Sequence, residues 1–437
     1  SNVTNFDRLF YRSSASSFNE NVRTLTPAKH KTQFPTYRKH PQLSSWNTSK
    51  VTTMLETFRN AEAFNGDIST WNTAGVTDMN QMFRQAKAFN QDLSNWVTSK
   101  VTKMIGTFYD ARAFNGNIST WNTASVNTMQ GMFRDAKDFN GDISKWNTAN
   151  VLEMGTMFTG TEMFNSDISS WNISKVTGLS YAFSSTKAFN QNLTEWTTTQ
   201  LSDISNLFNN AKQFNGNIST WDTSKVVLMN QIFASAENFN GDVSRWNTSS
   251  VETLHSTFHN AKLFNGDISN WDTSSVETLE STFYGASKFN GDLSWDTSRV
   301  TNLFNTFRDA SDFNGDLSSW NTAKVTTMVY TFKSAGQFNG NVSNWNTSSV
   351  ENMERTFREA GEFNGDVSRW DVSSVTKMHG TFRQATKFNI SDLTKWDISK
   401  VTDLENIFYE AGNFNGDISS WNMSSVKNTQ NMFTRTP

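Results

Sequence analysis

The chain has 437 residues, no cysteine and a formal net charge of -3 at pH 7. Without cysteine there is no disulfide framework, thiolate metal site or cysteine nucleophile. The near-neutral charge gives no general attraction to nucleic acid or anionic membranes, and no apolar run approaches the roughly 18 residues of a membrane-spanning helix. We therefore expect neither nucleic acid nor a membrane interior as a partner.

Residues 1–45 differ in composition from the rest of the chain. They carry seven basic residues against Asp7 and Glu20, a net charge of +5, whereas the remainder is acidic. We expect this segment to be either a cap on the domain that follows or an arm that contacts a second molecule. The candidate contact residues of this arm are Arg23, Lys29, Lys31, Arg38 and Lys39.

Tryptophan marks a repeat that runs through residues 46–433. All 16 Trp residues, from Trp46 to Trp421, follow one another at steps of 25 residues, with one step of 24 before Trp295 and one of 26 before Trp396. Self-similarity at this period indicates a solenoid, a propeller or an array. One unit is too small to form a stable core alone, so successive units must stack as the coils of a solenoid.

Each unit reads V-T-x-M-x-x-M/T-F-x-x-A-x-x-F-N-G-D-I-S-x-W-N/D-T-S-x. Val76, Met79, Phe83 and Ala86 have the spacing of one face of a short helix, and a preceding Ser or Thr is suited to its N-cap. Residues 67–73 are compatible with a short β-strand after a turn. The predicted fold is an α/β repeat solenoid of about 16 coils, each with a short strand, a turn and a short helix.

Two columns of residues recur in every regular unit, an Asn after the second Phe and the Trp. An amide both donates and accepts hydrogen bonds, so we interpret the Asn column as a structural ladder rather than a ligand-binding row. The Trp column is interpreted as core rather than as a sugar-stacking surface. Representative ladder residues are Asn65, Asn90, Asn115, Asn140, Asn240, Asn265, Trp71, Trp121 and Trp221.

The unit resembles the repeats of the BspA-family leucine-rich-repeat surface proteins, in the 25-residue FNxDxSxWDxSxVxxM variant of mycoplasma-lipoprotein-type and protist surface proteins. The matching text includes MFRQAKAFNQDLSNWVTSKVTKM at residues 82–104, and the resemblance spans roughly residues 46–433. It implies a leucine-rich-repeat-like, right-handed solenoid in an extracellular or cell-surface location. It brings no catalytic residues, and the chain has no lipobox cysteine.

Signals for a cofactor are weak. His255 and His259 are four apart on a segment predicted to be helical and can share a metal ion, but solvent-facing positions explain them more simply. Asp recurs after Phe-Asn-Gly, and Ca²⁺ can bridge stacked carboxylates. Four units carry Asn at this position, which favours turn capping by Asx side chains. We expect no cofactor and no metal, with Ca²⁺ as the weaker alternative.

Several Asn residues lie in Asn-x-Ser/Thr sequons, which accept glycans in a eukaryotic secretory protein. An Asn at the Asp position creates a sequon automatically, because Ser or Thr follows two residues later. The candidate glycosylation residues are Asn47, Asn117, Asn172, Asn192, Asn217, Asn247, Asn341, Asn346 and Asn422.

Both ends of the repeat region carry incomplete units. Residues 10–22 resemble the MF-x-x-A-x-x-FNGDI half, with Phe10 two residues early and Phe18 in the place of the second Phe. Met432 and Phe433 end the other half, before a tail at 434–437. We hypothesise that the last coil of one molecule is continued by the N-terminal half-unit of the next, which builds a filament. The alternative is a monomer whose N-terminal segment caps its own first coil.

Two classes of function follow from these features. The first is a non-enzymatic extracellular structural protein that assembles head to tail into a filament, appendage or surface layer, with itself as partner. The second is an adhesin or binding module that recognises a host protein, matrix protein or glycan through the exposed face of the solenoid. An enzyme is the least favoured class, because no acid/base or nucleophile constellation departs from the repeat.

Overall fold

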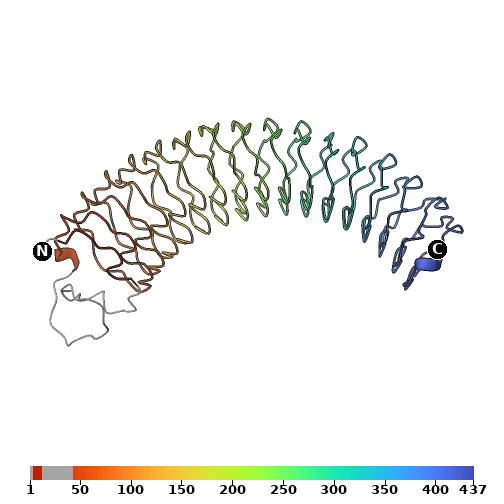
Figure 1. Ribbon diagram of the computed structural model, residues 1–437, viewed down its shortest axis with the longest axis horizontal. Helices are drawn as coiled ribbons and strands as arrows, with labels where there is room; N and C mark the ends of the chain where they lie inside the picture. Colours follow the sequence, from red (N-terminus) through yellow and green to blue (C-terminus); the bar gives the residue numbers. More distant parts are fainter. Residues whose placement is uncertain (1–2, 12–42) are drawn as a thin grey trace, which may run out of the picture. The chain divides into compact units, whose positions relative to one another are not determined.

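The chain folds into a solenoid whose successive coils are joined by a parallel ladder. The computed structural model describes residues 3–11 and 43–437 and divides into two units, Ser1–Gln200 and Leu201–Pro437. In the first unit, single parallel bridges join one residue of each coil to the next from Asn5 to Gly178; in the second, they run from Asp203 to Asn428. Figure 1 shows the coils of each unit following one another in chain order. The predicted solenoid is confirmed.

The short helix predicted in every coil is wrong. In the described ranges the only helices are two 3-10 turns, η2 (Leu43–Ser45) and η3 (Met423–Ser425). The predicted strand is misplaced as well: residues 67–73 contain a turn at Ser69 and Thr70 and no bridge, whereas the parallel bridge of the same coil is at Asp78, inside the segment expected to be helical. A second bridge, between Asp392 and Asp417, lies within the predicted strand region.

Alternating hydrogen bonds explain why a helix-like spacing gives no helix. The N–H groups of Met54, Glu56 and Phe58 donate to carbonyl groups of the next coil at 2.8–3.0 Å. The N–H groups between them turn back, as from Thr57 to the Met54 carbonyl three residues earlier. From Met54 to Asn60, every second backbone donor is therefore used between coils, and this segment forms a row of tight turns with apolar side chains every three or four residues.

Left-handed backbone at two positions per coil stops helix formation. Glu56 and Asn60, two residues before and after Phe58, have φ of 55° and 62°. The equivalent residues in the other described coils share this conformation, including Gly106 and Gly160. Such φ values cost an L-residue about 1–2 kcal/mol, so they are held by the turns and by the bonds to neighbouring coils.

Aromatic rings fill the interior of each unit. Trp71 and Trp96 stack with centroids 6.5 Å apart and planes 2° from parallel, and Trp221 and Trp246 repeat this geometry. The indole N–H of Trp121 donates to the carbonyl of Leu93, in the preceding coil, at 3.1 Å. Every Trp after Trp46 is less than a tenth exposed, and in each unit the apolar column is the core that one coil alone cannot provide.

Candidate functional site

The Asn column forms hydrogen bonds along the outside of the ladder. The backbone N–H of Asn90 donates to Oδ1 of Asn65 at 2.8 Å, and Asn115 and Asn140 continue the series at 2.8 and 2.9 Å. In the second unit Asn265 donates in the same way to Asn240. Because the amide oxygen of each coil accepts an N–H of the following coil, this column ties neighbouring coils together.

The Asp column caps turns within each coil. Oδ1 of Asp242 accepts the hydroxyl and the backbone N–H of Ser244 at 2.7 and 2.9 Å. The hydroxyl bond, with the backbone bond after it, lowers the pKa of Asp242 from its ordinary value. The same Asx turn recurs at Asp267 and Asp142. These carboxylates are directed at their own turn, which is the arrangement expected of Asx capping.

The sequon asparagines are exposed and form the same turns. Oδ1 of Asn117 accepts the backbone N–H of Ser119 at 3.0 Å, and Asn247 accepts that of Ser249 at 3.1 Å. Glycosylation at these residues stays a prediction.

The predicted histidine pair lies on turns rather than on one helix face. Nδ1 of His255 is 3.9 Å from Oε1 of Glu280, whereas the ring of His259 packs against Tyr284 with centroids 4.5 Å apart. Burial, with the charge of His255 second, lowers the pKa of His259. The two imidazoles are thus engaged with different residues of the following coil.

A half-coil formed by residues 3–11 packs on the first complete coil. The N–H groups of Phe6, Arg8 and Phe10 donate to the carbonyls of Thr53, Leu55 and Thr57 at 3.2, 3.0 and 2.8 Å. These are the same bonds that join complete coils, although the two segments are 47 or more residues apart in the chain.

The side chains of this half-coil follow the interior pattern. Arg8 has a φ of 57°, like Glu56 beside it, and its Nε donates to Oε2 of Glu56 at 2.7 Å. Phe10 stacks on Phe58 with centroids 5.0 Å apart and is 4% exposed. The structure therefore places Phe10 at the regular Phe position of its own chain, as the capping alternative requires.

The outer edge of the last coil differs from interior edges. The N–H groups of Thr429, Asn431 and Phe433 have no hydrogen-bond acceptor within the described residues. The Phe433 ring stacks on Phe408 at 5.8 Å but is 46% exposed, whereas Met432 is buried. This edge thus combines free backbone donors with an exposed aromatic ring. The other predicted assembly residues, Phe18, Arg23, Lys29, Lys31, Arg38 and Lys39, lie outside the described residues.

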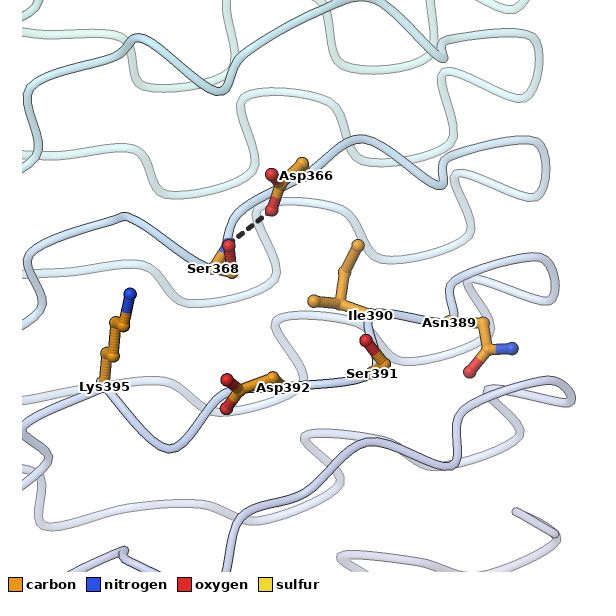
Figure 2. Close-up of a pocket in the computed structure, with 7 residues that line it drawn as sticks. All are labelled: Asp366, Ser368, Asn389, Ile390, Ser391, Asp392 and Lys395. Atoms are coloured by element: carbon orange, nitrogen blue, oxygen red, sulfur yellow. Dashed lines mark hydrogen bonds between the residues drawn. The ribbon is translucent and has the colours of Figure 1, made fainter.

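A polar pocket of about 260 Å³ lies where one coil gains a residue. In Figure 2, Ile390, Ser391 and Asp392 lie on this longer coil, and Asp366 bonds to Ser368 on the coil before it. Asn389 and Lys395 complete the lining. The sequence located the extra residue but gave no sign of the pocket.

These features define a class: a leucine-rich-repeat-like solenoid of stacked 25-residue units with aromatic columns inside and Asn and Asp columns outside. The family described as "Mycoplasma protein of unknown function, DUF285" matches residues 28–126, 93–196, 116–217, 177–294, 265–354, 293–392 and 339–437. The chain belongs to this family. No curated protein matches it in sequence, and no helix in the described part has the length and hydropathy of a membrane span.

Three solved structures are similar to this chain. The Toll chain of the Drosophila Toll–Spatzle complex is 9% identical over 84% of this chain, with a TM-score of 0.28. TLR13 in complex with ssRNA13 is 10% identical over 86%, with a TM-score of 0.20. An internalin, InlF of Listeria monocytogenes, is 8% identical over 88%, with a TM-score of 0.21. The alignment covers 50% of the Toll chain, 61% of the TLR13 chain and 87% of the internalin.

Proposed function

We propose that this protein is a non-enzymatic, BspA-like surface protein whose molecules join head to tail outside the cell as a filament or surface layer. The observation that carries this proposal is the half-coil 3–11. It docks on a coil edge through the ladder bonds of the interior, although it is far from that edge in the sequence. A coil edge is therefore able to accept a segment that does not directly continue it.

The direction of the ladder makes the two outer edges complementary. The backbone N–H groups of Met54, Glu56 and Phe58, and of the equivalent residues in other coils, donate to the following coil. The carbonyl groups of the residues just before them accept bonds from the preceding coil. The last coil accordingly presents N–H donors, and the half-coil presents the carbonyls of Asn5, Asp7 and Leu9, which accept no bond within the described residues. A contact between the donor edge of one molecule and the acceptor edge of the next is heterologous. Such a contact can be repeated from molecule to molecule and builds an open filament.

The register of this joint follows from the interior bridges. Asn428 bridges Asp403, and Asn5 bridges Thr53, so both belong to the same column. Continuing the column puts Asn5 of a second copy beside Asn428. The N–H groups of Thr429, Asn431 and Phe433 then meet the carbonyls of Asn5, Asp7 and Leu9. Unpaired strand edges promote this kind of pairing.

Two substitutions in the last coil test the joint in the full-length chain. Thr429→Pro removes a backbone donor that the chain itself does not use, and Phe433→Glu puts a charge at the exposed ring. We expect wild-type molecules to form linear assemblies, by electron microscopy and sedimentation velocity, and both variants to remain monomers with unchanged circular dichroism.

A matched control places the same charge outside the paired segment. Ser420→Glu puts Glu at the column where Glu195 occurs naturally, and Phe433→Leu keeps the edge apolar; both should assemble. Wild-type protein that stays monomeric at all concentrations, or linear assemblies that persist in Thr429→Pro and Phe433→Glu, would contradict the joint. Those results would favour the alternative function, binding of a protein or glycan by the exposed face.

A further inference from the structure

Three metal-ligating side chains converge in the second unit. His379 lies on one coil, and Asp403 and Glu405 lie on the next. Nδ1 of His379 is 3.8 Å from Oδ2 of Asp403 and 3.6 Å from Oε2 of Glu405, and the three ligand atoms all lie within 4.8 Å of one another. The His379 side chain is 13% exposed and the two carboxylates are about one third exposed, so the cluster is sheltered yet open to ions.

The distances suit one small cation between the three atoms. Two ligands held about 2.1 Å from a tetrahedral metal ion are about 3.4 Å apart. The two nitrogen–oxygen separations exceed this value by only a few tenths of an ångström, which a small side-chain rotation removes. Both separations are also too long for direct hydrogen bonds, so the space between the atoms is not taken up by contacts among themselves.

Hydrogen bonds already orient both carboxylates. Oδ1 of Asp403 accepts the backbone N–H of Glu405 at 2.9 Å, and Oε1 of Glu405 accepts from the Asn406 amide at 2.9 Å. Oε2 of Glu405 accepts a further bond from Asn428 at 2.9 Å and keeps a lone pair toward His379. Outer contacts of this kind fix ligand orientation in metal sites.

Neither carboxylate of this cluster is paired with a basic side chain in the described part of the chain, and the nearby guanidinium of Arg355 contacts the ring of His379 instead. Among the described residues, neither Asp403 nor Glu405 forms an ion pair with Lys or Arg. Elsewhere a carboxylate in the ladder region takes such a partner: Glu410 pairs with Arg435, and Glu237 pairs with two Lys residues. A divalent cation bound between the two carboxylates would supply a positive partner of this kind.

We propose that His379, Asp403 and Glu405 form a binding site for a divalent first-row transition metal ion such as Zn²⁺ or Mn²⁺. One imidazole and two carboxylates are a mixed nitrogen and oxygen set, which these ions accept. Ca²⁺ and Mg²⁺ prefer oxygen ligands alone and are expected to bind more weakly. Because the ligands come from two coils, the ion ties the coil of His379 to the coil that follows.

Arg355 contacts the other nitrogen of the His379 ring. Its guanidinium lies 3.2 Å from Nε2, whereas Nδ1 faces Asp403 and Glu405. Nδ1 is therefore the ring nitrogen that is placed to bind the metal ion.

The repeat provides an internal comparison in the same columns. His255 has the column position of His379, and Glu280 on the next coil has that of Glu405 and accepts from Asn302 just as Glu405 accepts from Asn428. The residue in the place of Asp403 is Thr278. The His255 position therefore has two of the three ligands.

Isothermal titration of the full-length chain with ZnCl₂ tests this site. We expect His379→Ala to bind one Zn²⁺ fewer than wild type, and His255→Ala to bind as many as wild type. The isosteric Asp403→Asn and Glu405→Gln variants should lose at least about tenfold in affinity, the loss caused even by outer-contact changes. Circular dichroism of each variant checks that the fold is kept.

A gain-of-site variant makes the test independent of any loss of folding. Thr278→Asp completes the set at His255 and Glu280, so it should bind one Zn²⁺ more than wild type. Equal stoichiometry and affinity in wild type and His379→Ala would overturn the proposal, and so would a Thr278→Asp variant with no additional Zn²⁺.

Discussion

The two ends of the ladder carry the same residue pattern but finish it differently. At the N-terminal end, Phe6 and Phe10 are 6% and 4% exposed. At the C-terminal end, Phe433 has the column position of Phe10 and is 46% exposed. The equivalent rings in interior coils, such as Phe258 and Phe357, are fully buried.

The contrast between the interior coils and the last coil shows how much of a coil's stability comes from its neighbours. A coil with a neighbour on each side buries its rings and satisfies its N–H groups, whereas the last coil satisfies only those that face inward. Interactions between coils should therefore contribute less to the free energy of unfolding in the last coil. Interactions within one coil should contribute the same in every coil.

The largest difference is expected between the two terminal Phe residues. Phe10→Ala removes a buried ring and should lower the free energy of unfolding by about 3–5 kcal/mol. Phe433→Ala removes a ring that is half exposed and should cost about 1 kcal/mol. Urea denaturation of dilute, monomeric protein measures both values. Equal costs would show that the ends do not differ in the way their burial indicates.

A smaller difference is expected along the Asn column. Oδ1 of Asn240 accepts the N–H of Asn265, whereas Oδ1 of Asn415 accepts no bond within the described residues. Asn240→Ala should therefore cost about 1 kcal/mol or somewhat more, because it leaves an N–H unpaired, and Asn415→Ala should cost close to nothing. Hydrogen exchange at the amide of residue 265 should accelerate only in the first variant. A loss as large in Asn415→Ala would contradict the ladder.

The smallest effect concerns the Asp turns, which should not depend on position. The backbone and hydroxyl groups of Ser244 and Ser419 lower the pKa of Asp242 and Asp417 below the ordinary value of 3.8. A lowered folded-state pKa stabilises the fold above the unfolded-state pKa, and the gain is lost as pH falls through the folded-state value. Denaturation between pH 2 and 6 should show that Asp242 and Asp417 lose the same contribution to the free energy of unfolding on acidification.

The control for the acid experiment is an amide at the same position. Asn occurs naturally in this column at Asn117 and Asn217, so Asp242→Asn should fold normally and keep the turn. Its stability should change less with pH than that of wild type. A pH dependence as steep as in wild type would mean that Asp242 makes no contribution.

The solenoid was predictable from the spacing of Trp and Phe because a column of large rings has to be buried by stacking. The local backbone was not predictable from the same spacing. Val76, Met79 and Phe83 fit a helix face equally well as a row of turns, and inter-coil bonds decide between the two. A signal was present: Gly or Asn recurs two residues before and after the first Phe, as at Gly106 and Asn210, where φ is positive.

The half-coil at the N-terminus also had a sequence signal. Val3-Thr4-Asn5-Phe6 with Phe10 repeats the V-T-x-M-x-x-x-F spacing, but Phe6 in place of Met hides it. The His379 cluster is even harder to find in the sequence, because Asp403 and Glu405 follow His379 by 24 and 26 residues. They become neighbours only when one coil is laid on the next.

The two irregular units show where this architecture tolerates a change in length. Trp295 follows a missing residue and Trp396 follows an added one, yet both indoles still donate to the preceding coil at 3.0 Å. The bridges from Thr278 to Asn302 and from Lys377 to Asp403 are also intact. We therefore expect the stretch between Phe-Asn and Trp to be the place at which a short foreign peptide can be grafted with least disturbance of the stacked coils.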